Sequence, residues 1–186
     1  MKTYSLMNYV PVSAERRYGY CASEEELMAR HDVWHFKDGN CSPKILQGLA
    51  DGINELKGTN SVVCFIPAST AAKTVTRYGD VSRKLQNMTG VPCSYTAISK
   101  ENDSEAGHIS GKKADPAEDF SFDSRFFKGK TVILIDDVVT RGNTLKSTAS
   151  RLLNLGASDV IALVVARTFN PFFPPIVFPE RQVVNL

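Results

Sequence analysis

The stretch from Val132 to Thr144 constrains this chain more than any other, because it combines a buried strand, an acidic pair and a helix start. Residues Thr131 to Ile135 are a continuous run of β-branched and aliphatic side chains, as expected of a central parallel strand covered on both faces. Asp136 and Asp137 follow that run. The carboxyl end of such a strand is where open α/β sheets bind ligands. The stretch therefore predicts a ligand site at the edge of a parallel sheet.

The loop that follows the acidic pair has the composition of a phosphate site. Thr140 to Thr144 supplies hydroxyls, an Arg, a Gly that lets the backbone approach a ligand, and the start of a helix. Free backbone N–H groups and a positive helix end attract an anion. The loop can hold a phosphate and the carboxylates a polyhydroxyl group, and a sugar phosphate offers both. The alternative is a strand with a solvated acidic turn, which leaves two adjacent carboxylates without a partner.

Length and composition indicate one ordinary globular domain of 186 residues. Hydrophobic residues make up 42% and charged residues 23% of the chain, and the net charge of +2 is too small to predict nucleic acid as a partner. We expect no signal peptide and no membrane span. Four cysteines without a disulfide pattern predict a reduced, cytoplasmic protein.

Helical and strand patterns alternate along the chain, which predicts a parallel sheet built from βαβ units. The expected helices cover Ser23–Arg30, Ser42–Gly58, about Ala72–Met88, and a segment from Thr144 to Gly156. The expected strands cover Val33–Gly39, Val62–Ile66, Cys93–Ile98, Thr131–Ile135 and Asp159–Ala166. Val75, Tyr78, Val81, Leu85 and Met88 are expected to face the core. Leu145, Leu152, Leu153 and Leu155 mark the last helix.

Three segments lack this alternation. Met1 to Tyr20 has no clear period and is expected to form an edge strand or an extended arm. Ser99 to Phe120 is long and polar, which favours a functional lid over an idle surface insertion. Asn170 to Pro179 is rich in Pro and is expected to be extended.

The Val132–Thr144 stretch resembles the 5-phosphoribosyl-1-pyrophosphate (PRPP) motif of type I phosphoribosyltransferases, in which four hydrophobic residues and two acids precede a Thr- and Gly-rich loop. The resemblance implies that Asp136 and Asp137 bind the ribose hydroxyls. It implies a 5′-phosphate site made by the residues of the loop, which are Val138, Val139, Thr140, Arg141, Gly142, Asn143 and Thr144. It also implies an α/β, Rossmann-like fold: a parallel sheet flanked by helices, a flexible lid loop, and one domain over residues 1–186 with hood segments at about 1–35 and 169–186.

PRPP needs a second anion site for its pyrophosphate. The loop after Val62–Ile66 opens another helix, and the family has its pyrophosphate loop at this position. The residues implied are Ala68, Ser69, Thr70, Lys73 and Arg77. Ser and Thr at a helix start also serve as simple caps, so the two interpretations stay open.

A closer resemblance is to ComF-like, competence-associated phosphoribosyltransferases. It rests on Phe36–Gly39, Ile66–Ala68, Arg77–Asp80, the polar segment around His108 to Lys113, and Asp136–Thr144, in that order. It implies transfer of a 5-phosphoribosyl group to a purine or pyrimidine base with release of pyrophosphate. Asp136, Asp137, Lys112, Lys113 and His108 are the expected catalytic residues.

The expected cofactor is Mg²⁺, held mainly through PRPP rather than by protein ligands. The family also implies a homodimer as an open alternative to a monomer. Two other functions remain open. The chain can be a regulator that binds PRPP or a nucleotide without turnover, or a ComF-like accessory protein for DNA uptake or processing, with weak and salt-sensitive DNA binding.

Cys21, His31, His35 and Cys41 are the remaining cluster of metal-ligand types. Their irregular gaps do not fit a zinc-finger pattern, which favours packing and surface roles over a metal site.

Overall fold

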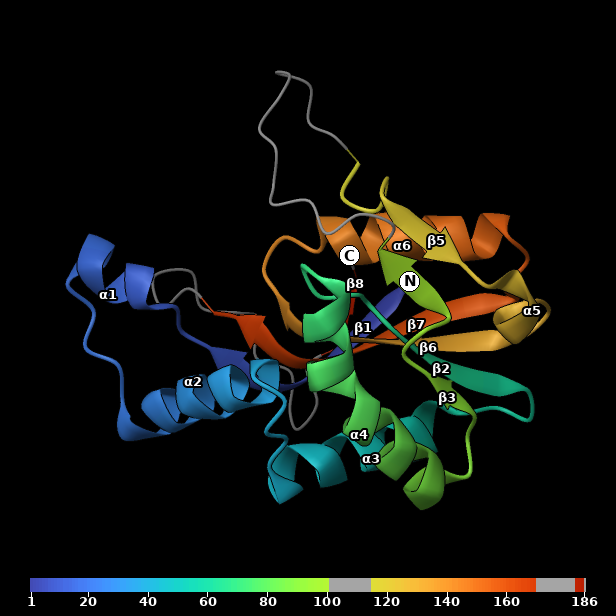
Figure 1. The fold of residues 1–186 in the computed structure, drawn as a ribbon. Coiled ribbons are helices and arrows are strands. Elements are labelled where there is room, and N and C mark those ends of the chain that lie inside the picture. Colours follow the sequence, from blue (N-terminus) through green and yellow to red (C-terminus); the bar gives the residue numbers. More distant parts are fainter. Residues whose placement is uncertain (101–114, 170–182, 186) are drawn as a thin grey trace.

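The computed structural model describes residues 1–100, 115–169 and 183–185 of the chain, the last three by their backbone alone. A six-stranded sheet in the order β3-β2-β6-β7-β1-β8 forms its centre, and a two-stranded sheet pairs β4 with β5 (Figure 1). All neighbouring strands of the large sheet are parallel except β1 and β8, which are antiparallel. The predicted parallel α/β sheet is therefore confirmed.

The strands are β1 (Lys2–Tyr9), β2 (Ser61–Phe65), β3 (Cys93–Ser94), β4 (Ile98–Lys100), β5 (Phe120–Phe122), β6 (Thr131–Val139), β7 (Asp159–Thr168) and β8 (Val183–Asn185). The helices are α1 (Val12–Tyr18), α2 (Glu24–Lys37), α3 (Pro43–Leu56), α4 (Ala71–Thr89), α5 (Ser124–Phe127) and α6 (Asn143–Asn154). Among these described helices, none combines the length and apolar character that a membrane span requires.

The central strands bury both faces, so each face has its own core (Figure 1). On one face, Ile133 and Ile135 of β6 pack with buried residues of α2, α3 and α4. On the other face, Val132 and Leu134 pack with α6 and with Phe127 of α5. Because successive strand residues point to opposite faces, a continuous apolar run is the sequence of a strand covered twice.

Side-chain caps start the helices where the sequence predicts them. Ser23 forms a capping box with Glu26: the Ser23 Oγ accepts from the Glu26 N–H at 3.3 Å, and the Ser23 N–H donates to Oε2 at 2.8 Å. Ser42 caps α3 with Pro43 in its first turn, and Thr70 caps α4. These local interactions satisfy backbone donors that the helices cannot pair internally.

The prediction of a strand over Val33–Gly39 is wrong, because α2 continues to Lys37. The buried residues of this helix are Arg30, Val33 and Phe36, which are spaced by three and lie on one helical face. Phe36 is fully buried against the sheet, so tertiary packing outweighs the local β-propensity of the segment. Only the predicted turn at its end is present, where Gly39 has φ 87°.

The prediction of one strand over Cys93–Ile98 is also wrong. The chain leaves the large sheet after β3 and joins the small sheet as β4. The Ser94 hydroxyl accepts a hydrogen bond from the Ala97 N–H at 3.1 Å, which bends the chain between the two strands. Ile98 then pairs with Phe122.

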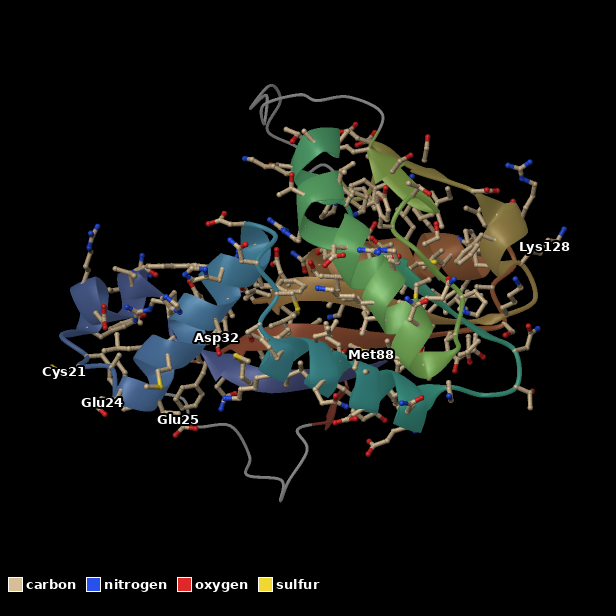
Figure 2. All side chains as sticks on the ribbon, turned by 60° about the horizontal axis from the view of Figure 1, so that its bottom comes forward. Cys21, Glu24, Glu25, Asp32, Met88 and Lys128 are labelled. Carbon is tan, nitrogen blue, oxygen red and sulfur yellow. The ribbon has the colours of Figure 1, made fainter. Side chains whose placement is uncertain are left out.

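Several expected core positions lie at the surface. Val75 and Met88 of α4 are 55% and 42% exposed, and Figure 2 labels Met88 at the outer side of that helix. Tyr78, Val81 and Leu85 are buried as predicted. Of the leucines of α6, Leu145 and Leu152 are buried, whereas Leu153, and Leu155 just after the helix, are exposed. The buried face of each of these helices is therefore narrower than the row of apolar residues in its sequence.

The N-terminal segment forms a strand, which was one of the two structures expected for it. This strand does not lie at the edge of the sheet. β1 pairs with β7 on one side and with β8 on the other. The lid interior at 101–114 and most of the Pro-rich tail, at 170–182, lie outside the described residues. The antiparallel pair of β4 and β5 flanks the lid segment in the sequence.

Gly39 holds the connection between α2 and α3 against α4. A Cβ atom at this residue would lie 2.5 Å from the backbone oxygen of Thr76, and the positive φ adds strain for any other residue. Gly90, after α4, has φ 69° but nothing within 4 Å of such an atom.

We therefore expect Gly39→Ala to destabilise the protein more than Gly90→Ala. The left-handed backbone costs each variant about 1 kcal/mol, and the collision with Thr76 costs Gly39→Ala roughly 2 kcal/mol more. Urea unfolding of both variants beside the wild type measures the difference. Equal losses of unfolding free energy would contradict the close packing at Gly39.

Candidate functional site

The acidic pair lies within β6 rather than after it. Strand β6 continues to Val139 because Asp136 and Val138 keep their pairing with Val164 and Ala166 of β7. Alternation along the strand directs the two carboxylates to opposite faces. Asp136 lies on the α6 side and Asp137 on the side of α2 and α4, where each has a different set of partners.

A pocket of about 300 Å³ opens where β6 ends and α6 begins. The complete predicted 5′-phosphate loop lines it, together with one acid and one apolar residue: Asp136, Val138, Val139, Thr140, Arg141, Gly142, Asn143, Thr144 and Leu145. Gly142 has φ 71° and immediately precedes α6, so the loop turns sharply and directs the helix start toward the pocket. The structure thus brings together the loop residues that the sequence groups.

A hydroxyl pair holds the phosphate loop to the neighbouring strand. The Oγ1 atoms of Thr140 and Thr168 lie 2.8 Å apart, at the carboxyl ends of β6 and β7. Thr140 is exposed and also lines the pocket. Since β7 is anchored in the sheet, this bond fixes the position of an otherwise surface-exposed loop.

Two cations engage Asp137 on the other face of β6. The Nη1 of Arg77 forms an ion pair with Oδ2 of Asp137, and the Nζ of Lys37 lies 3.7 Å from Oδ1. The side chains of Arg77 and Asp137 are only 13% and 12% exposed, whereas that of Lys37 is 39% exposed. The Arg77 Nε also donates to the Lys37 carbonyl at 3.2 Å, which ties the end of α2 to α4.

Asp136 is the most perturbed acid of the site. Burial, and next the negative charge of Asp137, raise the pKa of Asp136 to about 8. The Asp137 N–H, which donates to Asp136 Oδ1 at 2.8 Å, and the charges of Arg77 and Lys37 offset only part of this rise. The unliganded pocket therefore holds Asp136 as a neutral carboxylic acid near pH 7.

The predicted pyrophosphate loop leaves the carboxyl end of β2, beside β6. Some of its polar groups form hydrogen bonds within the protein. The Ala68 N–H donates to Thr74 Oγ1 at 2.9 Å, and Thr70 caps α4 by accepting from the Lys73 N–H at 3.2 Å. Ser69 is exposed. Arg77, the fifth residue predicted for this role, instead contacts Asp137.

Two lysines near these loops were absent from the predicted site residues. Lys37 contacts Asp137, and in the sequence it lies within the Phe36–Gly39 segment. Lys100, at the end of β4, donates to the Ser69 carbonyl at 3.4 Å and brings a cation to the pyrophosphate loop. No sequence signal indicates Lys100, because the pairing of β4 with β5 is what directs it there.

The remaining predicted residues divide into two groups. His108, Lys112 and Lys113 lie outside the described residues. His31 and His35 have ring centroids 4.1 Å apart on α2, and Figure 2 shows Cys21 at the outer end of the α1–α2 extension. Over residues 1–100 and 115–169, no group of three or more His, Cys, Asp or Glu side chains is arranged to hold a metal ion.

Comparisons with solved structures give distant matches. An allosteric regulatory enzyme of purine biosynthesis is 19% identical, with a TM-score of 0.44 over 81% of this chain and 28% of that one. This chain therefore spans less than a third of that enzyme's length. Trypanosoma cruzi hypoxanthine phosphoribosyl transferase is 15% identical, with a TM-score of 0.44 over 81% and 70% of the two chains. An adenine phosphoribosyltransferase is 20% identical, with a TM-score of 0.42 over 68% and 71%.

No curated protein sequence gave a significant match. The family model for the phosphoribosyl transferase domain, in contrast, matches residues 37–170. This range covers most of the chain and includes Lys37, the loop after β2 and the complete pocket after β6. The chain therefore belongs to the type I phosphoribosyltransferase family, and its parallel sheet with helices on both faces is the fold expected from its sequence.

Proposed function

We propose that the protein transfers the 5-phosphoribosyl group of PRPP to a nitrogenous base, purine or pyrimidine, and releases pyrophosphate. The observation that carries this proposal is the pocket in which Asp136 and the whole Val138–Thr144 loop face one space. The loop offers backbone N–H groups, hydroxyls and Arg141 to a phosphate. Asp136 offers a carboxyl group to the hydroxyls of the attached ribose.

The charges around the pocket favour a ligand with several negative charges. Asp137 is neutralised by Arg77, and Asp136 is protonated near pH 7. The cations on the surrounding elements are Lys37, Lys73, Arg77, Lys100 and Arg141. This excess of positive charge at one edge of the sheet supports binding of a phosphate and a pyrophosphate on the same molecule.

The reaction would be a displacement at the anomeric carbon. The lone pair of a base nitrogen forms the new bond while the electron pair of the breaking C–O bond leaves with pyrophosphate. The chain's own groups would position the ribose and neutralise the leaving group, which is where most of the rate enhancement of such a site arises. The lid residues His108, Lys112 and Lys113 remain proposed for this second task.

Mg²⁺ fits this arrangement when PRPP is bound. The described residues supply one pocket-lining carboxylate, Asp136, and no cage of protein ligands. A hard cation that keeps several waters and binds mainly substrate phosphate oxygens needs no more than this. When bound, Mg²⁺ would supply charge neutralisation of the leaving pyrophosphate.

We further propose a single phosphoribosyltransferase domain over residues 1–186, with about 1–35 and 169–186 as hood segments, of the ComF-like type. The matching segments occur in the ComF-like order, and Lys37 and Arg77 of two of them meet at Asp137. The four cysteines are free thiols, which supports a reduced cytoplasmic setting.

The second candidate is a PRPP sensor without transferase activity. Two groups of the predicted pyrophosphate loop favour this sensor function. The Ala68 N–H and the Thr70 hydroxyl already form hydrogen bonds at the start of α4, so they are less available to pyrophosphate. Pyrophosphate release distinguishes the two functions.

The protonation of Asp136 predicts how stability depends on pH. Above pH 3.8 the unfolded carboxyl group is ionised, while the folded one keeps its proton up to about pH 8. The folded state therefore binds more protons in this window, and rising pH favours unfolding by up to about 1.4 kcal/mol per unit. Asp136→Asn removes this dependence. We expect the variant to gain stability relative to wild type between about pH 5 and 8, measured by urea unfolding. Parallel pH profiles of the two proteins would contradict the assignment.

Transferase activity predicts pyrophosphate release from PRPP and Mg²⁺ in the presence of a suitable base. We expect Asp136→Asn to lower this rate at least about tenfold, since it removes a ribose contact of about 1.4 kcal/mol. Because this variant is expected to be at least as stable as wild type near neutral pH, the loss of rate would report on the site. Release that is equal in both proteins would refute the ribose role. No release with any base, together with a melting temperature raised by PRPP in wild type alone, would establish the sensor.

Lys37 is expected to contact the diphosphate of PRPP, because its half-exposed amine lies beside Asp137 near the carboxyl end of β6, on the face of that strand opposite the pocket. Lys37→Gln should raise the KM for PRPP about tenfold, because it removes the binding free energy of one charge-assisted hydrogen bond. It should cost less than about 1 kcal/mol of stability, since the ion pair is partly solvated. Steady-state kinetics with Lys44→Gln, an exposed lysine of α3, provide the matched control. An unchanged KM in Lys37→Gln would remove Lys37 from the site.

A further inference from the structure

The hydroxyl group of Tyr78 is a buried donor without a partner. Tyr78 belongs to α4, and its side chain is fully buried in the core between the sheet and the helices α2, α3 and α4. Among the residues that the structure describes, none forms a hydrogen bond with this hydroxyl. Burying an unpaired polar group is costly, and native proteins contain few such groups. The hydroxyl is therefore expected to have a partner in another state of the protein.

Two neighbouring aromatic rings hold Tyr78 in place. The ring centroids of Phe65 and Phe36 lie 4.9 and 6.1 Å from that of Tyr78. Both of these rings are themselves buried, so the Tyr78 ring is packed closely in the core. The phenolic oxygen lies on the axis about which the ring rotates, so a ring flip does not move it. A partner must therefore come to the hydroxyl.

The acidic pair is close enough to act on this hydroxyl. Burial, and next the charges of Asp136 and Asp137, raise the pKa of Tyr78 well above its usual value, and Arg77 offsets part of this rise. The phenol therefore keeps its proton and remains a hydrogen-bond donor. Of the two carboxylates, that of Asp137 lies on the same face of the sheet as Tyr78.

The neighbour of Tyr78 in the sequence holds the Asp137 oxygen that this donor could use. Oδ1 of Asp137 accepts from the Val138 N–H and lies 3.7 Å from the Nζ of Lys37, whereas Oδ2 contacts the Nη1 of Arg77. The guanidinium carbon of Arg77 lies 5.7 Å from the centre of the Tyr78 ring. Two possible donors to Oδ2 therefore come from adjacent residues of α4.

Arg77 has a second expected task, which conflicts with its observed position. The sequence assigns it to the pyrophosphate of PRPP. In the structure, its Nη1 contacts Asp137, its Nε donates to the Lys37 carbonyl at 3.2 Å, and its side chain is largely buried. A pyrophosphate contact therefore requires Arg77 to move away from Asp137. That movement would leave Oδ2 as a buried acceptor without its cation, which is costly unless another donor replaces it.

We propose that Asp137 exchanges partners when PRPP binds: Arg77 turns to the pyrophosphate, and the Tyr78 hydroxyl donates to the Oδ2 atom that Arg77 has left. This inference rests on the proposed function. Tyr78 is then a positioning residue, which holds Asp137 in place and contacts no ligand itself. The exchange gives a partner to the buried hydroxyl, which offsets part of the cost of separating the ion pair.

A double-mutant cycle tests the exchange without any substrate. Tyr78→Phe removes only the hydroxyl, so with Arg77 in place it should raise the urea concentration at the unfolding midpoint. Arg77→Met removes the donor to Oδ2, so Tyr78 can then donate to that atom. In this background, Tyr78→Phe should lower the midpoint. Thr3→Val is the matched control, because it also removes a buried hydroxyl without a partner, and it should shift the midpoint equally in both backgrounds.

Calorimetric titration with PRPP and Mg²⁺ tests the bound state. The Kd for PRPP should be about tenfold higher in Tyr78→Phe than in wild type, because the complex loses one hydrogen bond to a carboxylate. Thr3→Val should bind PRPP as wild type does. A merely structural role of Tyr78 would not make the variant more stable and yet weaker in binding. This measurement uses single variants, so it decides the inference even where Arg77→Met does not fold.

The contrary outcomes are distinct from one another. Equal midpoint shifts for Tyr78→Phe in both backgrounds overturn the exchange, whatever the binding data show. An unchanged Kd in Tyr78→Phe also overturns the exchange, and leaves the proposed function standing because wild type still binds PRPP. Absence of PRPP binding in wild type itself refutes the proposed function and the exchange together.

Discussion

The placement of two adjacent carboxylates at the end of β6, with Asp137 buried and Asp136 half-buried, is the constraint on which the rest of the site depends. Two ionised acids in this position would be costly to desolvate. The structure resolves the cost in two ways: Asp137 pairs with Arg77, and Asp136 keeps its proton. Both solutions require elements far away in the sequence, because Arg77 comes from α4 and the burial comes from the sheet and its covering helices. The acidic pair is therefore stable only because distant elements supply a cation for one acid and a desolvated position for the other.

Because the two carboxylates lie on opposite faces of β6, each one has its own set of partners in the site. On one face, Asp136 joins the phosphate loop and the start of α6. On the other, Asp137 gathers Lys37 from the end of α2 and Arg77 from α4. Parallel strands bring all their carboxyl ends to one edge, so both groups open toward the same region. A ligand with a phosphate at one end and a pyrophosphate at the other matches that division.

Much of the fold could be predicted because its signals are local. Continuous apolar runs mark strands covered on both faces, and Ser23, Ser42 and Thr70 mark helix starts through their own hydrogen bonds. Predictions failed where a distant contact overrides a local preference. Val33–Gly39 has β-forming residues, yet it extends α2 because Phe36 fills the core beside Tyr78, with ring centroids 6.1 Å apart. The strand predicted over Cys93–Ile98 divides because Ile98 finds a partner in Phe122.

The sequence by itself determined the chemistry of the phosphate loop, because all of its groups are neighbours along the chain between a strand end and a helix start. Only the tertiary structure decided which acid faces that pocket, that Arg77 and Lys37 belong to Asp137, and that Lys100 approaches Ser69. It also decided that the hydroxyl oxygens of Thr140 and Thr168 lie 2.8 Å apart. These are contacts between strands and helices separated by tens of residues. Their geometry follows from the order and register of the sheet, and no pattern along the chain encodes those directly.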